Sequence, residues 1–242
     1  VHGYTPGRFV LTQMAELPFL GDKAEPLSVA FHRVASKHPE FDAEHQRAGV
    51  KPLAYFTHGP GIVFNTKRPI VKPEDLQGLK FRVGGGMVNE ISKTLGMNVT
   101  LKPAPDSYEL LSTGVMDGTL FPAESTDSFK IDKIIKHATV FPGGLYNTSF
   151  VFMINPARYD KLTADEKKAV DAVSGEVAAR IFGKGWDRVD AIATDNMKKN
   201  GVTIAPASPA LISEVKIGVK PLDGDGAAAT DAKALKSVCV VV

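Results

Sequence analysis

The first clear pattern in the chain is an apolar stripe at helical spacing within residues 25–37. The stripe consists of Leu27, Ala30, Phe31, Val34 and Ala35. Its members recur three or four positions apart, as one face of an amphipathic helix requires. Pro26 fits the expected first turn, where a backbone N–H would have no partner within the helix. We therefore predict a helix over Glu25–Lys37.

Short runs of apolar, β-branched and aromatic residues predict a series of strands. They lie at Leu53–Thr57, Ile62–Asn65, Leu79–Val83, Asn98–Leu101, Thr148–Ile154 and Val202–Ala205. Helical patterns stand between or after them, over Met87–Leu95, Asp106–Val115, Ser125–His137 and Pro209–Val219. Short strands that alternate with helices favour an α/β fold with a parallel sheet and right-handed crossovers.

A much longer helical pattern begins at the capping box of Thr163 and Glu166 and runs to Asn200 and Gly201. One apolar stripe consists of Val170, Val173, Val177 and Ile181, and a second of Trp186, Val189, Ala193 and Met197. At 1.5 Å per residue the helix would be about 55 Å long. A lobe of about 100 residues, with a radius of gyration near 13 Å, cannot cover that length. The helix therefore either kinks at Gly183 and Gly185 or crosses two lobes.

Composition narrows the function classes. The chain has 242 residues, 43% of them hydrophobic and 23% charged, which is typical of a globular protein. No apolar run approaches the roughly 18 residues that span a membrane. A net charge of +2 with scattered basic residues gives no basis for nucleic-acid binding. The single Cys239 excludes an internal disulfide and a cysteine-based zinc site. The opening residues lack a signal-peptide pattern, which fits a mature exported protein, a fragment or a cytosolic protein.

Arg82 is the strongest candidate for chemistry. It ends a predicted strand and precedes Gly84–Gly86 and a predicted helix. In α/β sheets ligands bind at the carboxyl ends of strands, and a guanidinium there could meet an anion together with the N–H groups of the helix. An ion pair on the surface or between lobes would explain the same arginine. The glycines match neither a dinucleotide-binding nor a phosphate-loop motif.

Other polar groups form no recognisable centre. His38, Glu40, Asp42, Glu44 and His45 lie close together in the sequence, but their spacing matches no metal site, and we interpret them as a solvated loop. Ser112 and Ser125 lack a nucleophile motif, and Asp117 belongs to a turn signal. We therefore predict no catalytic residue, no metal and no cofactor. If the chain were an enzyme, Glu124 or His58 would be the titratable groups to consider.

Three segments carry a resemblance to a known family. They are FNTKRPIVKPEDLQGLKFRV (Phe64–Val83), DSYELLSTGVMDG (Asp106–Gly118) and YDKLTADEKKAV (Tyr159–Val170). In order and spacing they resemble the periplasmic solute-binding proteins of TRAP transporters, the DctP-like family, across residues 1–210. The resemblance implies two α/β lobes braced by one long kinked helix. It places residues 1–60 and 148–186 in the first lobe and residues 61–147 and 187–242 in the second.

The resemblance also implies a function. Such a protein, its signal peptide removed, binds a small organic carboxylate between its lobes in the periplasm and delivers it to a membrane permease. A two-lobe hydrolase or isomerase, or a sensor that presents its ligand to a receptor, would use the same cleft. The chain begins after the strand–helix–strand unit with which the family usually starts, and residues 227–242 resemble no family C-terminus. We therefore expect an incomplete first lobe.

The same resemblance assigns roles to individual residues. Arg82 matches the carboxylate-binding arginine of the family. Phe121, in the segment FPAES, takes the place of an amide residue found in several dicarboxylate and sialic-acid binders, and Ile62 takes that of a second arginine. These replacements favour a monocarboxylate with an apolar, aromatic or branched body, such as a 2-oxo or 2-hydroxy acid. Further ligand contacts are expected at Tyr4, Glu124, Tyr146 and Asn147.

Overall fold

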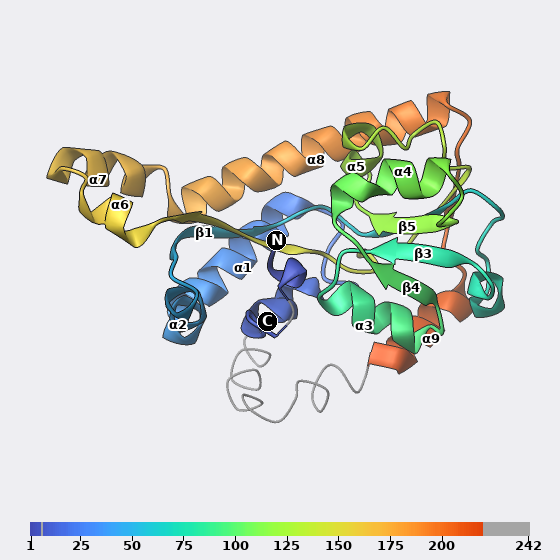
Figure 1. The fold of residues 1–242 in the computed structure, drawn as a ribbon, viewed down its shortest axis with the longest axis horizontal. Coiled ribbons are helices and arrows are strands. Elements are labelled where there is room, and N and C mark those ends of the chain that lie inside the picture. The colour runs from blue at the N-terminus through green and yellow to red at the C-terminus, as the bar shows by residue number, and fades with distance from the viewer. Residues whose placement is uncertain (6, 220–242) are drawn as a thin grey trace.

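The computed structural model describes residues 1–5 and 7–219, which form two β-sheets with helices packed around them (Figure 1). The larger sheet has six strands in the order β4-β3-β5-β2-β6-β8. Their bounds are Ile62–Asn65 for β2, Lys80–Val83 for β3, Asn98–Leu101 for β4, Gly118–Phe121 for β5, His137–Val140 for β6 and Thr203–Pro206 for β8. The smaller sheet pairs β1 (Lys51–Thr57) with β7 (Ser149–Ile154) in antiparallel register.

The larger sheet is mixed, whereas the sequence predicted a parallel one. Strand β3 is parallel to β4 and β5, and β6 is parallel to β8, but β2 runs antiparallel to both β5 and β6. The prediction missed β5 and β6 and assigned one helix to Ser125–His137, where only α5 (Glu124–Ser128) is α-helical. Both missed strands are defined by pairing with the distant β2. Strand β5 begins beside the turn signal of Asp117, and β6 begins at the end of the predicted helix.

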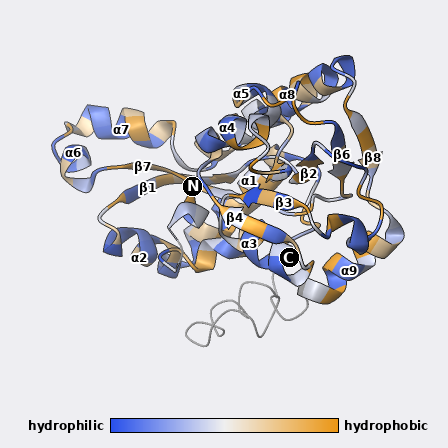
Figure 2. Ribbon diagram, turned by 45° about the vertical axis from the view of Figure 1, so that its right-hand side comes forward, coloured by the Kyte–Doolittle hydropathy of each residue, from blue (hydrophilic) through white to orange (hydrophobic). Residues whose placement is uncertain are grey.

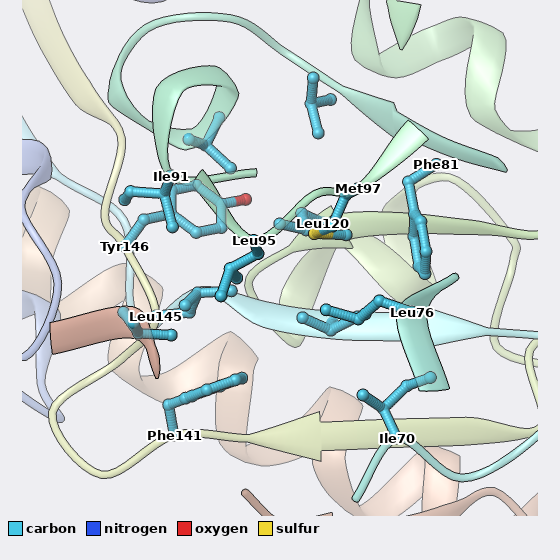
Figure 3. Packing of buried hydrophobic residues seen from close by; sticks show 14 of the residues in the cluster. Ile70, Leu76, Phe81, Ile91, Leu95, Met97, Leu120, Phe141, Leu145 and Tyr146 are labelled. Atoms are coloured by element: carbon cyan, nitrogen blue, oxygen red, sulfur yellow. The ribbon is translucent and has the colours of Figure 1, made fainter. Parts of the chain in front are cut away.

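Helices cover both faces of the larger sheet. On one face, α3 (Met87–Thr94) and α9 (Pro209–Val219) enclose a core that includes Phe81, Ile91 and Leu211 (Figure 3). On the other face, α4 (Ser107–Ser112), α5 and α8 (Gly175–Lys199) enclose a second core around Phe64, Leu111, Ile131 and Met197. Figure 1 shows the two helical layers on opposite sides of the strands. The short 3-10 helices η3 (Pro73–Leu76) and η4 (Ala104–Asp106) lie in the connections.

The smaller sheet packs against α1 (Ala24–Lys37) and α2 (Pro39–Arg47), with the 3-10 helices η1 (His2–Tyr4) and η2 (Leu11–Glu16) beside them. Its core contains Leu11, Phe31, Phe41 and Tyr55. The interpretation of residues 38–45 as a solvated loop is wrong. They lie mostly in α2, where His45 is buried and the Glu44 side chain accepts hydrogen bonds from the N–H groups of Val10 and Leu11. The predicted stripe on α1 is only partly right, because Ala30 is exposed and Ser28 is buried.

The long helical pattern is divided after Ala172 and has no break at Gly183 or Gly185, so of the two predicted alternatives the helix that crosses two lobes agrees with the structure. Helix α7 (Ala164–Ala172) ends before Ser174, and Gly175, with φ of +63°, begins α8. Helix α8 then continues through Gly183 and Gly185 without a break and reaches from the smaller sheet to the far side of the larger one (Figure 1). Hydrophobic and hydrophilic residues alternate along it (Figure 2). Within α8, Ala193 and Met197 are buried, whereas Val177 and Ile181 are exposed.

Two further segments join the sheets and lie side by side. Residues 58–61 lead from β1 to β2, and residues 145–148 lead into β7. Gly61 donates its N–H to the Tyr146 carbonyl at 2.8 Å, and Leu145 donates to the Gly61 carbonyl at 3.1 Å. With α8, these paired crossing segments connect two α/β lobes, so the predicted two-lobe fold is confirmed at this level. Among the described helices, none combines the length and apolar character needed to cross a membrane.

Some predictions concern residues that the structure does not describe. Residue 6 and residues 220–242 are outside the described ranges. They include Cys239, the unusual segment 227–242 and the end of the predicted second lobe.

Candidate functional site

A cavity of about 260 Å³ lies between the two sheets. From the side of the smaller sheet and α8 it is lined by Val1, Tyr4, His58, Thr148, Phe150 and Trp186. From the side of the larger sheet it is lined by Arg82, Ala104, Leu120, Phe121, Pro122, Glu124, Ser125, Ser128 and Phe129, and Tyr146 of the crossing segment completes it. Of the six residues predicted to contact a ligand, five line this cavity.

Arg82 lies on β3 at the carboxyl end that faces the cavity, and only 1% of its surface is exposed. Its Nε donates a hydrogen bond to the Lys102 carbonyl at 2.8 Å, and Nη2 lies 3.5 Å from the hydroxyl of Tyr4. The guanidinium carbon lies 4.5 Å from the centre of the Phe121 ring, a cation–π contact. These three contacts fix the plane of the guanidinium.

Among the described residues, no acidic side chain balances the charge of Arg82 at contact distance. None of the ion pairs between described residues involves it, and its two hydrogen bonds go to neutral oxygens. Burial lowers its pKa, because a desolvated cation is less stable. Three of the five guanidinium N–H groups have no partner among the described residues. Arg82 can therefore donate two parallel hydrogen bonds to a carboxylate.

Two tyrosine hydroxyls lie close to Arg82. The Tyr4 hydroxyl accepts from the Ala104 N–H at 3.1 Å and from Arg82, so its own proton remains available to a further acceptor. Tyr146 is buried, and burial raises the pKa of its phenol, which therefore stays protonated and a donor at neutral pH. Tyr146 also belongs to the core of the larger sheet (Figure 3). Both hydroxyls can therefore donate a hydrogen bond to an anion beside Arg82.

The Phe121 ring holds Arg82 from one side. It stacks on Phe129 with ring centres 5.4 Å apart and an interplanar angle of 21°. With Arg82 and Phe129 both against it, and 6% of its surface exposed, little of the ring is left for a ligand. Phe121 therefore mainly positions the guanidinium of Arg82, and little of its ring can contact a ligand.

Glu124 begins α5 at the edge of the cavity. Its side chain accepts hydrogen bonds from Ser125 Oγ at 3.2 Å and from Ser128 Oγ, and its backbone N–H donates to Asp190 Oδ1 at 2.7 Å. Asp190 belongs to α8, and burial raises its pKa to about 7. Helix α8 therefore fixes the start of the short helix that carries Glu124.

Asn147, the sixth of the predicted residues, is not among the residues that line the cavity. It is buried in the crossing segment, and its side-chain amide nitrogen faces the carbonyls of Gly59 at 3.0 Å and His58 at 3.1 Å. Asn147 therefore binds one crossing segment to the other. Its role here is to position the backbone of residues 58 and 59.

The sequence did not identify the aromatic wall opposite Arg82. His58 lies with its ring centre 5.8 Å from that of Trp186, 6.0 Å from Phe150 and 5.5 Å from Tyr146. Phe150 and Trp186 also lie 5.9 Å apart. These residues come from three segments far apart in the chain, so no local pattern could have grouped them. In the sequence, Trp186 belongs to an apolar helical stripe, and such a position is typical of a core residue.

The glycines after β3 do not leave a helix N-terminus open to an anion. The Met87 N–H at the start of α3 donates to Glu16 Oε2 at 2.9 Å, so a protein carboxylate already occupies that position. A Cβ on Gly85 would lie 2.4 Å from the carbonyl oxygen of Gly3, which shows that the glycines admit the backbone of η1. Burial raises the pKa of Glu16, which also accepts from the N–H and hydroxyl of Ser149. The N-terminus of α3 therefore offers no free N–H at Met87 beside Arg82.

The described residues contain no group of three or more His, Cys, Asp or Glu side chains that could hold a metal. What the cavity offers is one buried cation, hydroxyl donors and aromatic rings. This combination suits an organic anion with an apolar body.

Comparisons with known proteins agree with this geometry. The chain is 42% identical to a TRAP periplasmic solute-binding protein from Bordetella bronchiseptica with bound (R)- and (S)-mandelate. The structures match with a TM-score of 0.90, covering 98% of this chain and 76% of the other. A TRAP solute-binding protein from a marine metagenome, in complex with 3-hydroxybenzoate, is 31% identical. Its structure matches with a TM-score of 0.90, covering 98% of this chain and 75% of the other.

A third solved structure and a relative known by sequence extend the comparison. A TRAP solute-binding protein from Rhodoferax ferrireducens with copurified benzoate is 26% identical, with a TM-score of 0.89 over 98% of this chain and 75% of the other. The outer membrane transporter protein TsaT of Comamonas testosteroni is 28% identical over 91% of this chain and 65% of its own length. The chain thus spans somewhat less than two thirds of that relative.

The family model described as bacterial extracellular solute-binding protein, family 7 (DctP) matches residues 3–224. Proteins of this family and the solved relatives serve transport by binding solutes and are not enzymes. The order of the three sequence motifs, the two-lobe fold and the buried Arg82 all agree with that match. The chain belongs to family 7 of the bacterial extracellular solute-binding proteins, the DctP family.

Proposed function

We propose that this chain forms the binding site of a TRAP-transporter solute receptor that captures a small aromatic monocarboxylate. The observation that carries the proposal is the buried Arg82, which has no acidic partner among the described residues and faces a cavity with aromatic walls. A buried charge is costly unless it is paired, so an anionic ligand is the expected partner. The bound mandelate, 3-hydroxybenzoate and benzoate of three similar structures support this ligand class.

In this proposal each end of the ligand has its own surroundings. The carboxylate accepts two hydrogen bonds from Arg82 and further ones from the hydroxyls of Tyr4 and Tyr146. The ring of the ligand lies against His58, Phe150 and Trp186, where aromatic rings stack or meet edge to face. The carboxyl group of Glu124 in the same cavity disfavours a second carboxylate on the ligand. The pocket therefore accepts one negative charge.

We propose that the two lobes close over the ligand. Of the described residues, those up to 60 and 148–186 form the first lobe and those at 61–147 and 187–219 the second, and the paired crossing segments act as the hinge. Closure would exclude water and strengthen the attraction between Arg82 and the carboxylate, because the effective dielectric constant falls. The closed form would then deliver the ligand to a TRAP permease from the periplasm, in keeping with the extracytoplasmic role of the family.

A thermal-shift and calorimetric screen tests the proposal. We expect mandelate, benzoate or 3-hydroxybenzoate to bind one-to-one, with succinate and other dicarboxylates much weaker. A ligand at 100 times its Kd adds about 2.7 kcal/mol of stability. For a chain of this length that raises Tm by about 5–10 °C. A screen in which no aromatic carboxylate raises Tm, or in which succinate raises it as much, would contradict the proposal.

A further inference from the structure

His58 is held in a defined place and orientation in the cavity wall. Only 4% of its surface is exposed, and its ring is surrounded by Tyr146, Phe150 and Trp186. Its Nδ1 lies 2.5 Å from the Gly59 carbonyl oxygen, and Asn147 fixes that carbonyl from the other crossing segment. A ring held at one nitrogen and packed on several sides cannot easily rotate.

The contact with Gly59 also determines where the proton is. A carbonyl oxygen can only accept a hydrogen bond, so Nδ1 carries the hydrogen. In a neutral imidazole the other nitrogen, Nε2, is then an acceptor with a lone pair. Burial lowers the pKa of His58 to about 4, so the ring is neutral between about pH 5 and pH 8. His58 is therefore not a second cation for a carboxylate.

The acceptor on His58 faces the cavity without a donor from the protein. Within residues 1–5 and 7–219, no hydrogen bond engages Nε2, and this atom is not among the buried polar atoms that are sealed from solvent and lack a partner. Since His58 lines the cavity, the free side of Nε2 opens onto it. This side of the cavity, formed largely by aromatic rings, thus contains a ring-nitrogen acceptor that no described residue engages.

We infer that His58 is a specificity-determining residue, whose Nε2 accepts a hydrogen bond from a hydroxyl group on the body of an aromatic monocarboxylate. The inference rests on the proposed function and names the ligand class more closely. The site would prefer a hydroxylated aromatic acid over its parent acid, because the parent leaves a buried acceptor unpaired. 3-Hydroxybenzoate, bound by one similar protein, carries a hydroxyl on its ring, and mandelate, bound by another, carries one on the carbon next to the carboxylate, whereas benzoate has none.

Calorimetric titration of the wild-type chain with matched ligands is the first arm of the test. Mandelate is compared with phenylacetate and α-fluorophenylacetate, and 3-hydroxybenzoate with benzoate and 3-fluorobenzoate. Fluorine replaces the hydroxyl at similar size but cannot donate a hydrogen bond. We expect at least one hydroxylated acid to bind about 5- to 30-fold more tightly than both its parent and its fluorinated analogue.

The second arm changes His58. His58→Phe keeps a ring in the wall but removes the acceptor, and we expect it to reduce the preference for the hydroxylated acid to less than about twofold while the parent acid still binds. His58→Gln provides an amide oxygen near the position of Nε2 and should restore part of the preference. Circular dichroism shows whether each variant is folded. If His58→Phe is not folded, a wild type that binds the hydroxylated and fluorinated acids equally still overturns the inference.

The outcomes separate this inference from the proposed function. If the wild type binds both members of each pair equally, or if His58→Phe keeps the full preference, the inference is overturned while carboxylate capture stands. Failure of every aromatic acid to bind the wild type would overturn both. A preference for the hydroxylated acid that disappears in His58→Phe supports the assignment of Nε2.

Discussion

Replacing Arg82 with methionine is expected to weaken binding of the best aromatic carboxylate by roughly 30-fold to several thousand-fold. The reason is that removing one side of a buried, hydrogen-bonded charge pair typically costs about 2–5 kcal/mol. Arg82→Lys keeps the charge but loses the fork of parallel N–H donors and the bond from Nε to the Lys102 carbonyl. Its affinity should therefore lie between those of the wild type and Arg82→Met. Isothermal titration of wild type and both variants measures the change.

Two controls make the loss specific. Arg47→Met removes the same charge from an exposed position on α2, which is not part of the cavity lining, and should leave Kd unchanged within about twofold. Without ligand, Arg82→Met should be at least as stable as wild type, because a buried cation with no acidic partner among the described residues is replaced by an apolar chain. Full-strength binding by a folded Arg82→Met protein would show that the carboxylate is held elsewhere.

The second large effect is expected at Gly183, where α8 crosses the start of α1. A Cβ at this position would lie 2.5 Å from Glu25 Cα and 2.9 Å from the Ala24 carbonyl oxygen, both backbone atoms. Helix α1 is also fixed there by Asp187, whose carboxylate accepts from the N–H groups of Ala24 at 2.8 Å and Glu25 at 3.1 Å. Gly183→Ala should therefore destabilise the chain by about 1–3 kcal/mol, since the helices must separate.

Gly185 on the same helix provides the matched control. Apart from its chain neighbours and the backbone of α8 itself, no described atom lies within 4 Å of a Cβ built there, so Gly185→Ala meets no obstacle. Alanine has a higher helix propensity than glycine by about 1 kcal/mol, and this variant should be slightly more stable than wild type. Urea unfolding of the two variants should thus give changes of opposite sign. Changes of the same sign and size would contradict the packing of α8 on α1.

These glycines show where sequence patterns succeed and where they fail. Local spacing located the helical segments around residues 163–200, and the capping box of Thr163 and Glu166 is present as predicted. Two glycines within a helix suggested a kink, but Gly183 instead permits close contact with a helix more than 150 residues earlier in the chain. Close packing between distant segments leaves no local pattern, so the sequence could not distinguish the two causes.

The same limit applies to the sheet. Strands β2, β3, β4 and β7 were predicted within one or two residues because their own residues carry the signal. Strands β5 and β6 become strands through their pairing with β2, which is a tertiary contact. Helix α2 was mistaken for a loop because its residues are mostly polar, although Phe41 belongs to the core beside the smaller sheet and His45 is buried.

For the site, the sequence was informative about Arg82 and less so about its surroundings. The position of Arg82 at a strand end follows from local periodicity, and its assignment to carboxylate binding followed from family resemblance. The N-terminus of α3 was expected to offer N–H groups to the anion, but the Met87 N–H already donates to Glu16, which lies 71 residues away in the sequence. His58 and Trp186 join the cavity only through the folding of the crossing segment and α8.

A crystal structure of the chain with mandelate tests the central claim most directly. The account predicts that both carboxylate oxygens lie about 2.7–2.9 Å from guanidinium nitrogens of Arg82, with the ring of the ligand against His58, Phe150 and Trp186. A ligand whose carboxylate lies elsewhere in the cavity, with Arg82 still bonded only to Lys102 and Tyr4, would contradict it.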